Sequence, residues 1–535
     1  MTKNNFEKFN NEDINECTSR GMCSIAPNIA ALQELVMYFL KQSAFYLLKL
    51  EKLGANNQSI KTEIINDLSA LIFVNEFNEE QLFSIAMKGY FLLQNVKQTY
   101  KKQCSTKNIN CFELNEKINF NNKTPLSKAI SYGENLLLGK YNNIQSEKRN
   151  LLDILEIVIK STSLHLAKLN DMGYFEEFTF YIILKALNEY NHNKITAKII
   201  EEYTSKLAEL DNDLMLKISK ILTDKYGDIE KSTVSYSTEK GKAILVSGSN
   251  FSELEELLKQ TQNQNLDIYT HSELLLANTL PNFKKYPHLK GHFGDKTESN
   301  ILDFATFPGA IVLTKNSKKN SEYFYRGRLF SSGYIVPKGV IQIKNNDYSE
   351  VIKSAKEAKG FKTGKSKPSE ELGYNKELIQ KEFFNIKTKM ETGEIKRLFI
   401  IGMNTTSEIQ KEYFKNLICK IKPDEYVISL MDTKEKENIL QINLGDFLPF
   451  ATDLLHMLFE NFSISQKNIY FFFTNCNVIT ISNIITLKTH NAQNIFMADC
   501  PPTFLNPSVF TTLKREYQIK TTTTPELDLK LIREK

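Results

Sequence analysis

Ala243-Ile244-Leu245-Val246 is a short apolar run, and the polar turn Ser247-Gly248-Ser249-Asn250 follows it directly. Such a run, bounded by turn residues, is typical of a strand that is buried on both faces of a parallel sheet. Ser252 and Glu255 have the spacing of a capping box, so we expect an amphipathic helix to begin there and continue through residues 254–258. The succession of strand, turn and helix predicts an α/β unit.

The same alternation continues towards the C-terminus. Apolar runs that we interpret as strands occur at residues 266–269, 310–313, 398–401, 426–430 and 469–473. Helices are expected at residues 273–277, 406–418, 448–461 and 478–488. The polar segment 362–368 interrupts the pattern, and we interpret it as a linker between two α/β units. In open sheets of this kind, ligands bind at the carboxyl ends of the strands.

Residues 29–228 have a different pattern, with apolar residues three and four positions apart, as in amphipathic helices. The first of these helices is expected to end at Gly54. Further helical segments are expected at residues 61–74, 79–102, 149–169, 174–190 and 196–225. Successive helices with short connections predict a helical bundle.

The composition is that of a soluble globular protein. The 535 residues are 41% hydrophobic and 24% charged, and the net charge of +5 arises from 68 basic and 63 acidic residues. This excess is too small to indicate nucleic-acid binding. No apolar stretch approaches the ~20 residues of a membrane-spanning helix. The N-terminus leads into no apolar signal region, so we expect a cytoplasmic protein without a membrane segment.

The cysteines argue against two common classes of small site. There are seven of them, and none forms a Cys-x-x-Cys motif. The odd number does not suggest a secreted disulfide framework, and the missing motif excludes the usual zinc ribbon and thioredoxin-like arrangements. The closest pairs in the sequence are Cys17 with Cys23 and Cys104 with Cys111.

Several segments resemble, in order, those of the hybrid cluster protein family, also called prismane or hydroxylamine reductase. The central ones are Ile244-Leu245-Val246-Ser247-Gly248, Tyr269-Thr270-His271-Ser272-Glu273-Leu274-Leu275 and Lys285-Tyr286-Pro287-His288-Leu289. The similarity extends to Phe307-Pro308-Gly309, Phe504-Leu505-x-Pro507 and Thr523-Thr524-Pro525-Glu526. Near the N-terminus, Glu16-Cys17-x5-Cys23 resembles part of the family's cluster motif.

The resemblance implies a multidomain α and α/β fold. A helical bundle domain (residues 1–235) would be followed by two Rossmann-like α/β domains (residues 236–378 and 379–535). Members of this family carry a cubane-type iron–sulfur cluster near the N-terminus and an iron–sulfur–oxygen hybrid cluster between the domains. They reduce hydroxylamine or nitric oxide with electrons from a redox partner.

The ligands that the resemblance implies are mostly replaced in this chain. The eight positions that match the family's hybrid-cluster ligands are Ser249, Glu273, Ser317, Asn404, Asp432, Phe447, Asn477 and Ile479. Glu273 retains the family's ligand, and the other seven of the eight positions are substituted. The resemblance implies that Phe447 falls where the family has a cysteine. Serine and aspartate can bind iron, but the side chains of Phe447 and Ile479 have no electron pair to donate.

The N-terminal cluster motif is also incomplete. Cys17 and Cys23 match its last two cysteines, whereas the first two would fall around Asn5 and Lys8. Two thiolates cannot complete a four-cysteine site, and a rebuilt site would need Cys104 and Cys111 as well. The candidate metal ligands are therefore Glu273, Cys17 and Cys23, interpreted as vestigial, and no residue is assigned a catalytic role.

Glu273 and its neighbour His271 also have a structural interpretation. Glu273 follows a predicted strand, where a carboxylate suits the N-terminus of the next helix. His271 and Glu273 have the His-x-Glu spacing of zinc deaminases, but no Pro-Cys-x-x-Cys accompanies them, and His271 is interpreted as a hydrogen-bonded core residue.

Three hypotheses follow from the sequence. The first is a pseudoenzyme without a cofactor, in which larger residues such as Phe447 and Ile479 fill the lost cluster's space and the chain binds a protein or small-molecule ligand. The second is an iron–sulfur oxidoreductase with a smaller, remodelled metal site built on Glu273, Asp432 and nearby serine residues. Such an enzyme would need a redox partner. The third is a binding protein or non-redox enzyme that has filled the old cavity with a new ligand.

Overall fold

The computed structural model describes residues 25–55, 57–140, 146–191, 195–294, 300–315, 327–334, 336, 339–402, 408–431, 437–474, 477–498 and 507–534. They belong to two compact units. One unit consists of residues 1–211, 477–485 and 501–516, and the other of residues 212–476, 486–500 and 517–535. No helix in the described part of the chain is both long and apolar enough to cross a membrane.

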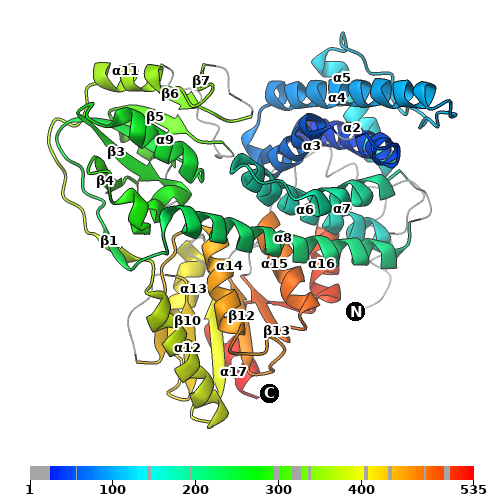
Figure 1. Cartoon of the computed structure of the whole chain (residues 1–535). Helices are drawn as coiled ribbons and strands as arrows, with labels where there is room; N and C mark the ends of the chain where they lie inside the picture. The colour runs from blue at the N-terminus through cyan, green and yellow to red at the C-terminus, as the bar shows by residue number, and fades with distance from the viewer. Residues whose placement is uncertain are drawn as a thin grey trace. The chain divides into compact units, whose positions relative to one another are not determined.

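The N-terminal part of the chain is helical (Figure 1). Its elements are α2 (Pro27–Lys52), α3 (Gln58–Ala70), η3 (Leu71–Glu76), α4 (Glu79–Thr106), α5 (Leu126–Lys140), α6 (Ser146–Asp171), α7 (Glu177–Glu189) and α8 (Ala197–Tyr226). The expected helices are present, and Gly54 follows the first of them with a φ of +78°. Sequence reasoning missed α5, which crosses α2 so closely that a β-carbon on Gly133 would lie 2.0 Å from the carbonyl oxygen of Ala31.

Within the helical unit, a buried carboxylate links three helices by hydrogen bonds. Asp211 lies on α8, and its carboxylate accepts hydrogen bonds from the hydroxyls of Ser161 on α6 and Ser482 on α15 (Val478–Thr489), each at 2.6 Å. Its other oxygen lies 2.6 Å from Nδ1 of His165 on α6. All four residues are fully buried, so this network joins a segment from near the C-terminus to the N-terminal helices without access to water.

The second unit contains two six-stranded parallel sheets. The first sheet consists of β2 (Lys242–Ser247), β3 (Leu266–His271), β4 (Leu289–His292), β5 (Ala310–Leu313), β6 (Leu329–Ser331) and β7 (Ile341–Gln342). The second consists of β9 (Arg397–Ile401), β10 (Glu425–Ser429), β11 (Ile439–Gln441), β12 (Ile469–Phe473), β13 (Asn494–Met497) and β14 (Ile519–Thr521). In both sheets the spatial order, counted from the first strand, is 3-2-1-4-5-6, which is the order of the Rossmann fold.

Helices connect the strands of both sheets (Figure 1). In the first sheet they are α9 (Phe251–Thr261), η4 (Ser272–Thr279), η5 (Pro281–Phe283) and α10 (Asn300–Thr306), and α11 (Ser349–Glu357) follows β7. In the order of the chain, α12 (Lys376–Glu391) precedes the second sheet, α13 (Glu408–Cys419) and α14 (Leu448–Phe459) connect its strands, and α17 (Pro525–Arg533) follows it. The connections on either side of β13 contain α15 and α16 (Pro507–Glu516), and α16 and most of α15 belong to the helical unit. The prediction of a multidomain α and α/β fold is therefore confirmed, whereas the exact limits of three domains stay a prediction.

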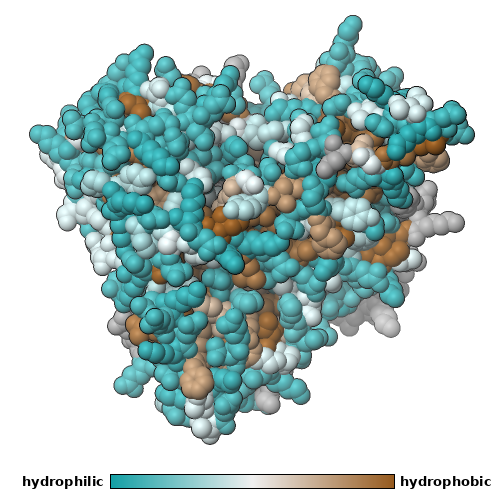
Figure 2. Space-filling view, viewed as in Figure 1, coloured by the Kyte–Doolittle hydropathy of each residue, from teal (hydrophilic) through white to brown (hydrophobic). Residues whose placement is uncertain are grey.

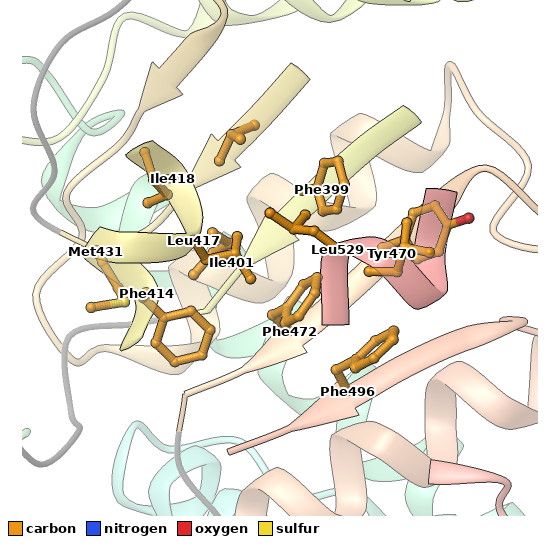
Figure 3. Close-up of a cluster of buried hydrophobic side chains, with 12 residues drawn as sticks. Phe399, Ile401, Phe414, Leu417, Ile418, Met431, Tyr470, Phe472, Phe496 and Leu529 are labelled. Atoms are coloured by element: carbon orange, nitrogen blue, oxygen red, sulfur yellow. The ribbon is translucent and has the colours of Figure 1, made fainter. Parts of the chain in front are cut away.

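Each sheet has its own apolar core. In the second sheet, Phe399, Tyr470, Phe472 and Phe496 come from neighbouring strands, and Leu529 of α17 packs against this cluster (Figure 3). The rings of Phe472 and Phe496 stack with centroids 4.7 Å apart. The surface seen in Figure 2 is mostly hydrophilic, with apolar residues in small patches. The apolar strands that the sequence predicted are thus the interior of this unit.

One local prediction was wrong, and one predicted linker has more structure than its composition suggests. The helix after β2 begins with Asn250, not with a capping box at Ser252, because the Asn250 side chain accepts hydrogen bonds from the amides of Ser252 and Glu253. The predicted linker, residues 362–368, is held to the chain before the first sheet by an antiparallel bridge between Lys365 and Thr238. Directly after it, β8 (Glu370–Leu372) pairs antiparallel with β1 (Ser232–Val234).

Replacing Asp211 by Asn should destabilise the helical unit by about 3 kcal/mol, because the buried hydroxyl and imidazole donors would lose their charged acceptor. Chemical unfolding followed by circular dichroism measures this. Glu202→Gln is the matched control, since Glu202 is an exposed residue of the same helix and should change stability by less than about 0.5 kcal/mol. Equal effects of the two substitutions would contradict the role given to Asp211.

Glu255 on α9 predicts a loss of stability in acid. Burial works to raise its pKa, but hydrogen bonds from Lys259, Lys225 and Tyr226 outweigh burial and hold the pKa at about 2, against an ordinary value of 4.5. A lowered pKa contributes stability that is present above pH 4.5 and is lost as the pH falls towards 2. Denaturation midpoints at several pH values should therefore decline less steeply for Glu255→Gln than for the wild type. Glu256→Gln should behave like the wild type.

Candidate functional site

The carboxyl edge of the first sheet is the natural place for a ligand site, because the strand order reverses between β2 and β5. The turn after β2 contains Gly248, with a φ of +133°, and Ser249, which is buried. The amide of Ser249 donates a hydrogen bond of 3.2 Å to the hydroxyl of Thr314, which follows β5. This hydrogen bond therefore joins the ends of β2 and β5 at the point where the strand order reverses.

A buried carboxylate accepts hydrogen bonds from residues at the same edge. Glu253, in the first turn of α9, is only 4% exposed. Its Oε1 accepts hydrogen bonds from the side chain of Asn250 at 3.0 Å and from the amide of Lys315 at 3.4 Å. The hydroxyl of Ser332, after β6, donates to Oε2. Glu253 thus connects α9 to the ends of two strands. Both of its carboxylate oxygens accept hydrogen bonds from the protein.

His271 ends β3 and lies between a hydroxyl and a carboxylate. Its Nδ1 lies 2.9 Å from Oγ of Ser247, and its Nε2 lies 3.4 Å from Oδ2 of Asp303 on α10. The ring also stacks on His292, with centroids 6.0 Å apart and an interplanar angle of 9°. A β-carbon on Gly294 would lie 2.6 Å from Oδ2 of Asp303, so only glycine leaves this carboxylate in place.

A serine, a histidine and an aspartate, as in a hydrolase triad, lie together here as Ser247, His271 and Asp303. Unlike in a hydrolase, the serine hydroxyl is not accessible to a substrate. Ser247 is fully buried and His271 is 2% exposed, whereas a nucleophile must reach its substrate. The hydroxyl also meets Nδ1 and the carboxylate meets Nε2, the reverse of the hydrolase arrangement. The trio therefore fixes the end of β3, in agreement with the interpretation of His271 as a hydrogen-bonded core residue.

Glu273 lies in the first turn of η4, directly after Ser272, which has a φ of +61°. The amide of Leu274 donates a hydrogen bond of 3.0 Å to the carbonyl oxygen of Gly248. This bond holds the first turn of η4 against the turn that carries Ser249. The structure therefore brings the two family-matching positions Ser249 and Glu273 to the same edge of the sheet.

Phe447 reaches this edge from the second sheet. It precedes α14 and is only 1% exposed. Its ring packs edge to face against Phe251, the first residue of α9, with centroids 5.1 Å apart, and against Phe450 at 5.2 Å. Two residues earlier, Gly445 approaches Leu275 of η4, and a β-carbon there would lie 3.3 Å from Cδ2 of Leu275. The position that matches a family cysteine is thus an aromatic core position.

The remaining family-matching positions lie outside the described residues or in the other compact unit. Cys17, Cys23, Ser317, Asn404 and Asp432 lie outside the described residues. Asn477 and Ile479 belong to the helical unit. The side chain of Asn477 accepts a hydrogen bond of 2.9 Å from the amide of Thr480 and so caps the start of α15, while Ile479 is half-buried.

The described residues at these positions do not fit an iron–sulfur–oxygen cluster. Such clusters are held by thiolates with a few imidazole or carboxylate ligands. Here Ser249 offers a hydroxyl and Glu273 a carboxylate, but the buried ring of Phe447 offers no donor atom. Among the described residues, no group of three or more histidine, cysteine, aspartate or glutamate side chains is placed to hold a metal ion.

Comparison with known proteins decides the family. The sequence profile of the Prismane/CO dehydrogenase family matches residues 13–431. The chain belongs to this family. It is 26% identical to a hydroxylamine reductase of Clostridium novyi, with 96% of each chain covered. Similar proteins include hydroxylamine reductases of Rippkaea orientalis and Methanocella arvoryzae, which are 25% and 24% identical over 96% of this chain and 97% of theirs. The predicted resemblance to the prismane family is confirmed.

Sequence reasoning missed several residues that shape the site within this prismane family member. Glu253 was overlooked because Glu255 was assigned to a capping box, although an acidic residue three positions after Asn250 is itself a helix-start signal. Asp303 and Thr314 gave no local signal, because their partners lie 32 and 65 positions away.

Replacing Phe447 by Cys, the residue type of the family motif, should cost about 3 kcal/mol, because the ring fills a buried site that the small side chain would leave partly empty. Thermal unfolding monitors this loss. Phe447→Leu should cost about half as much, since it retains most of the apolar volume. Phe384→Cys on exposed α12 is the control and should be nearly neutral. Wild-type stability in Phe447→Cys would contradict the packing role of Phe447.

Proposed function

We propose that this prismane family member has lost the hybrid cluster and its reductase activity, and that it acts as a cofactor-free binding or regulatory protein. The observation that carries the proposal is the buried ring of Phe447, packed between Phe251 and Phe450. Its binding partner would be a protein or a small molecule, and no redox partner would be needed.

Packing energetics support this proposal. A cluster that leaves its site exposes a void, and voids destabilise a protein by roughly 24 cal/mol per Å³. Burial of a phenylalanine side chain contributes about 1.5–3 kcal/mol in the opposite direction. An aromatic ring at a former ligand position therefore stabilises the chain without a cluster and would obstruct a cluster in the same place.

Hydrogen bonding at the sheet edge supports the same conclusion. Glu253 is engaged by Asn250 and Ser332, and Thr314 by Ser249, so these polar groups are satisfied by the protein itself. Glu273 is the one family-matching ligand retained at this edge. It is the residue on which a remodelled metal site, the alternative function, would depend together with Asp432.

Iron and acid-labile sulfide content after purification without oxygen tests the proposal. The hydroxylamine reductase of Clostridium novyi, expressed and purified in parallel, is the positive control for cluster assembly. We expect much less than one iron per chain, no visible charge-transfer bands, and no hydroxylamine reduction with a chemically reduced viologen dye. The control protein should contain iron and sulfide in the same preparation.

Stoichiometric iron and sulfide would overturn the proposal, and two variants would then locate the metal. Loss of metal in Glu273→Gln would indicate a remodelled site at the sheet edge. Loss in the double variant Cys17→Ala and Cys23→Ala would indicate a rebuilt N-terminal cluster.

A further inference from the structure

An irregular segment between α4 and α5, residues 107–125, lies across α2 and α4, and we call it the strap. Tyrosine hydroxyls hold its backbone. The amides of Phe112, Leu114 and Lys117 donate hydrogen bonds to the hydroxyls of Tyr100 (3.3 Å), Tyr46 (3.1 Å) and Tyr38 (3.1 Å), respectively. Two of these tyrosines lie on α2 and one on α4, so the strap is positioned on a helix pair by side-chain acceptors.

Ion pairs add to this attachment. The ammonium of Lys97 lies 2.6 Å from the carboxylate of Glu116, and that of Lys101 lies 2.9 Å from Glu113. Both acidic partners are largely exposed, and ion pairs at an exposed surface contribute little to stability. The strap is held by these polar contacts along its first half and by the buried ring of Phe120, which packs against Phe39 of α2, nearer its end.

A pair of thiols lies where the strap leaves α4. Cys104 is in the last turn of α4 and is 2% exposed, and Cys111 is partly exposed on the strap. A tight turn folds the strap back over the helix end: Asn108 has a φ of +52°, and the amide of Ile109 donates a 3.0 Å hydrogen bond to the carbonyl oxygen of Cys104. The amide of Phe112, the residue after Cys111, bonds to the hydroxyl of Tyr100, one helical turn before Cys104. The turn therefore brings Cys111 next to Cys104 at the end of α4.

We propose that Cys104 and Cys111 form a redox-responsive dithiol, which a small disulfide such as glutathione disulfide converts into an intrachain disulfide that fastens the strap to α4. The site is independent of the hybrid-cluster positions and of the function proposed above. It needs two neighbouring thiols, one of them accessible to an oxidant, and Cys104 and Cys111 meet both requirements.

Accessibility sets the order of the steps. The Cys111 thiolate attacks one sulfur of glutathione disulfide, whose sulfur–sulfur bond breaks, and one glutathione thiolate leaves and takes up a proton. The Cys104 thiolate then attacks the Cys111 sulfur and displaces the second glutathione. In sum, the two protein thiols lose two electrons and two protons, and one glutathione disulfide becomes two glutathione molecules.

The surroundings of Cys111 make the first step slow at neutral pH. Burial and the hydrogen bond with Cys104 raise the pKa of Cys111 to about 11, from an ordinary value of 9.0. Only the thiolate attacks a disulfide, so the thiolate fraction, and with it the rate, should increase about tenfold per pH unit between pH 7 and 9.

Peptide mapping tests the proposal on the full chain. The folded protein is incubated with glutathione disulfide at pH 7 and pH 9, remaining thiols are alkylated, and the protein is digested with trypsin. Cleavage after Lys102, Lys107 and Lys117 places Cys104 in peptide 103–107 and Cys111 in peptide 108–117. We expect a disulfide to join these two peptides. The linked product should form faster at pH 9 than at pH 7, and reduction should separate it into the two peptides.

Single variants test the order of the steps. In Cys104→Ala, Cys111 should accumulate as the mixed disulfide with glutathione, because the resolving thiol is absent. In Cys111→Ala, the buried Cys104 should stay reduced while the protein is folded. Cys419→Ala removes an exposed cysteine of α13 and should leave the linked peptide unchanged. Circular dichroism of each variant establishes that it is folded.

Three results would overturn the proposal. The first is a wild-type protein in which Cys111 accumulates as the glutathione adduct without a linked peptide. The second is a disulfide from Cys111 to a cysteine other than Cys104. The third is a protein in which both thiols stay fully alkylatable at pH 9 while free cysteine-containing peptides in the same solution are oxidised.

Discussion

The contact between Phe447 and Phe251 is the interaction on which the architecture of the α/β unit depends. Phe447 precedes a helix of the second sheet, and Phe251 begins the helix that follows the first strand of the first sheet. Edge-to-face aromatic contacts contribute about 0.5–1.5 kcal/mol beyond the burial of their area. Together with the approach of Gly445 to Leu275, this contact places the turns of both sheets against each other. The unit thereby buries a region that, in an open α/β sheet, commonly serves a ligand.

In this region, the residues that the family fold requires differ from those that binding a cluster requires. The strand order needs only apolar strands and their backbone hydrogen bonds. The turn at Ser249 needs the hydroxyl of Thr314, and the attachment of η4 to that turn needs one backbone hydrogen bond. Cluster chemistry needs donor atoms at particular positions, and donor atoms can be replaced while the backbone is retained. A fold can therefore persist when the site it once displayed has changed, and family membership alone does not assign an activity.

The sequence predicted the parts of the structure that depend on local patterns. Buried strands such as β2 and β12 were recognised because four or five consecutive apolar residues have few alternatives. Strands of two or three residues, such as β6, β7 and β11, were missed because so short a segment shows no period. The helix after β2 was assigned the wrong cap, since Asn250 and Ser252 are both good capping residues and only the backbone conformation distinguishes them. At the candidate site, the bulk of Phe447 was predictable, but the partners of His271 and Glu253 were not, because tertiary folding alone brings them together.

The outer strands of both sheets have a consequence for how another protein can bind here. The edge strands β4, β7, β11 and β14 contain four, two, three and three residues, respectively. A polypeptide that adds itself to a sheet edge gains affinity mainly from successive main-chain hydrogen bonds, and such short edges offer few of them. These edges therefore disfavour both edge-to-edge aggregation and recognition by β-strand addition. A protein that binds this unit must recognise it through side chains on its helices and loops.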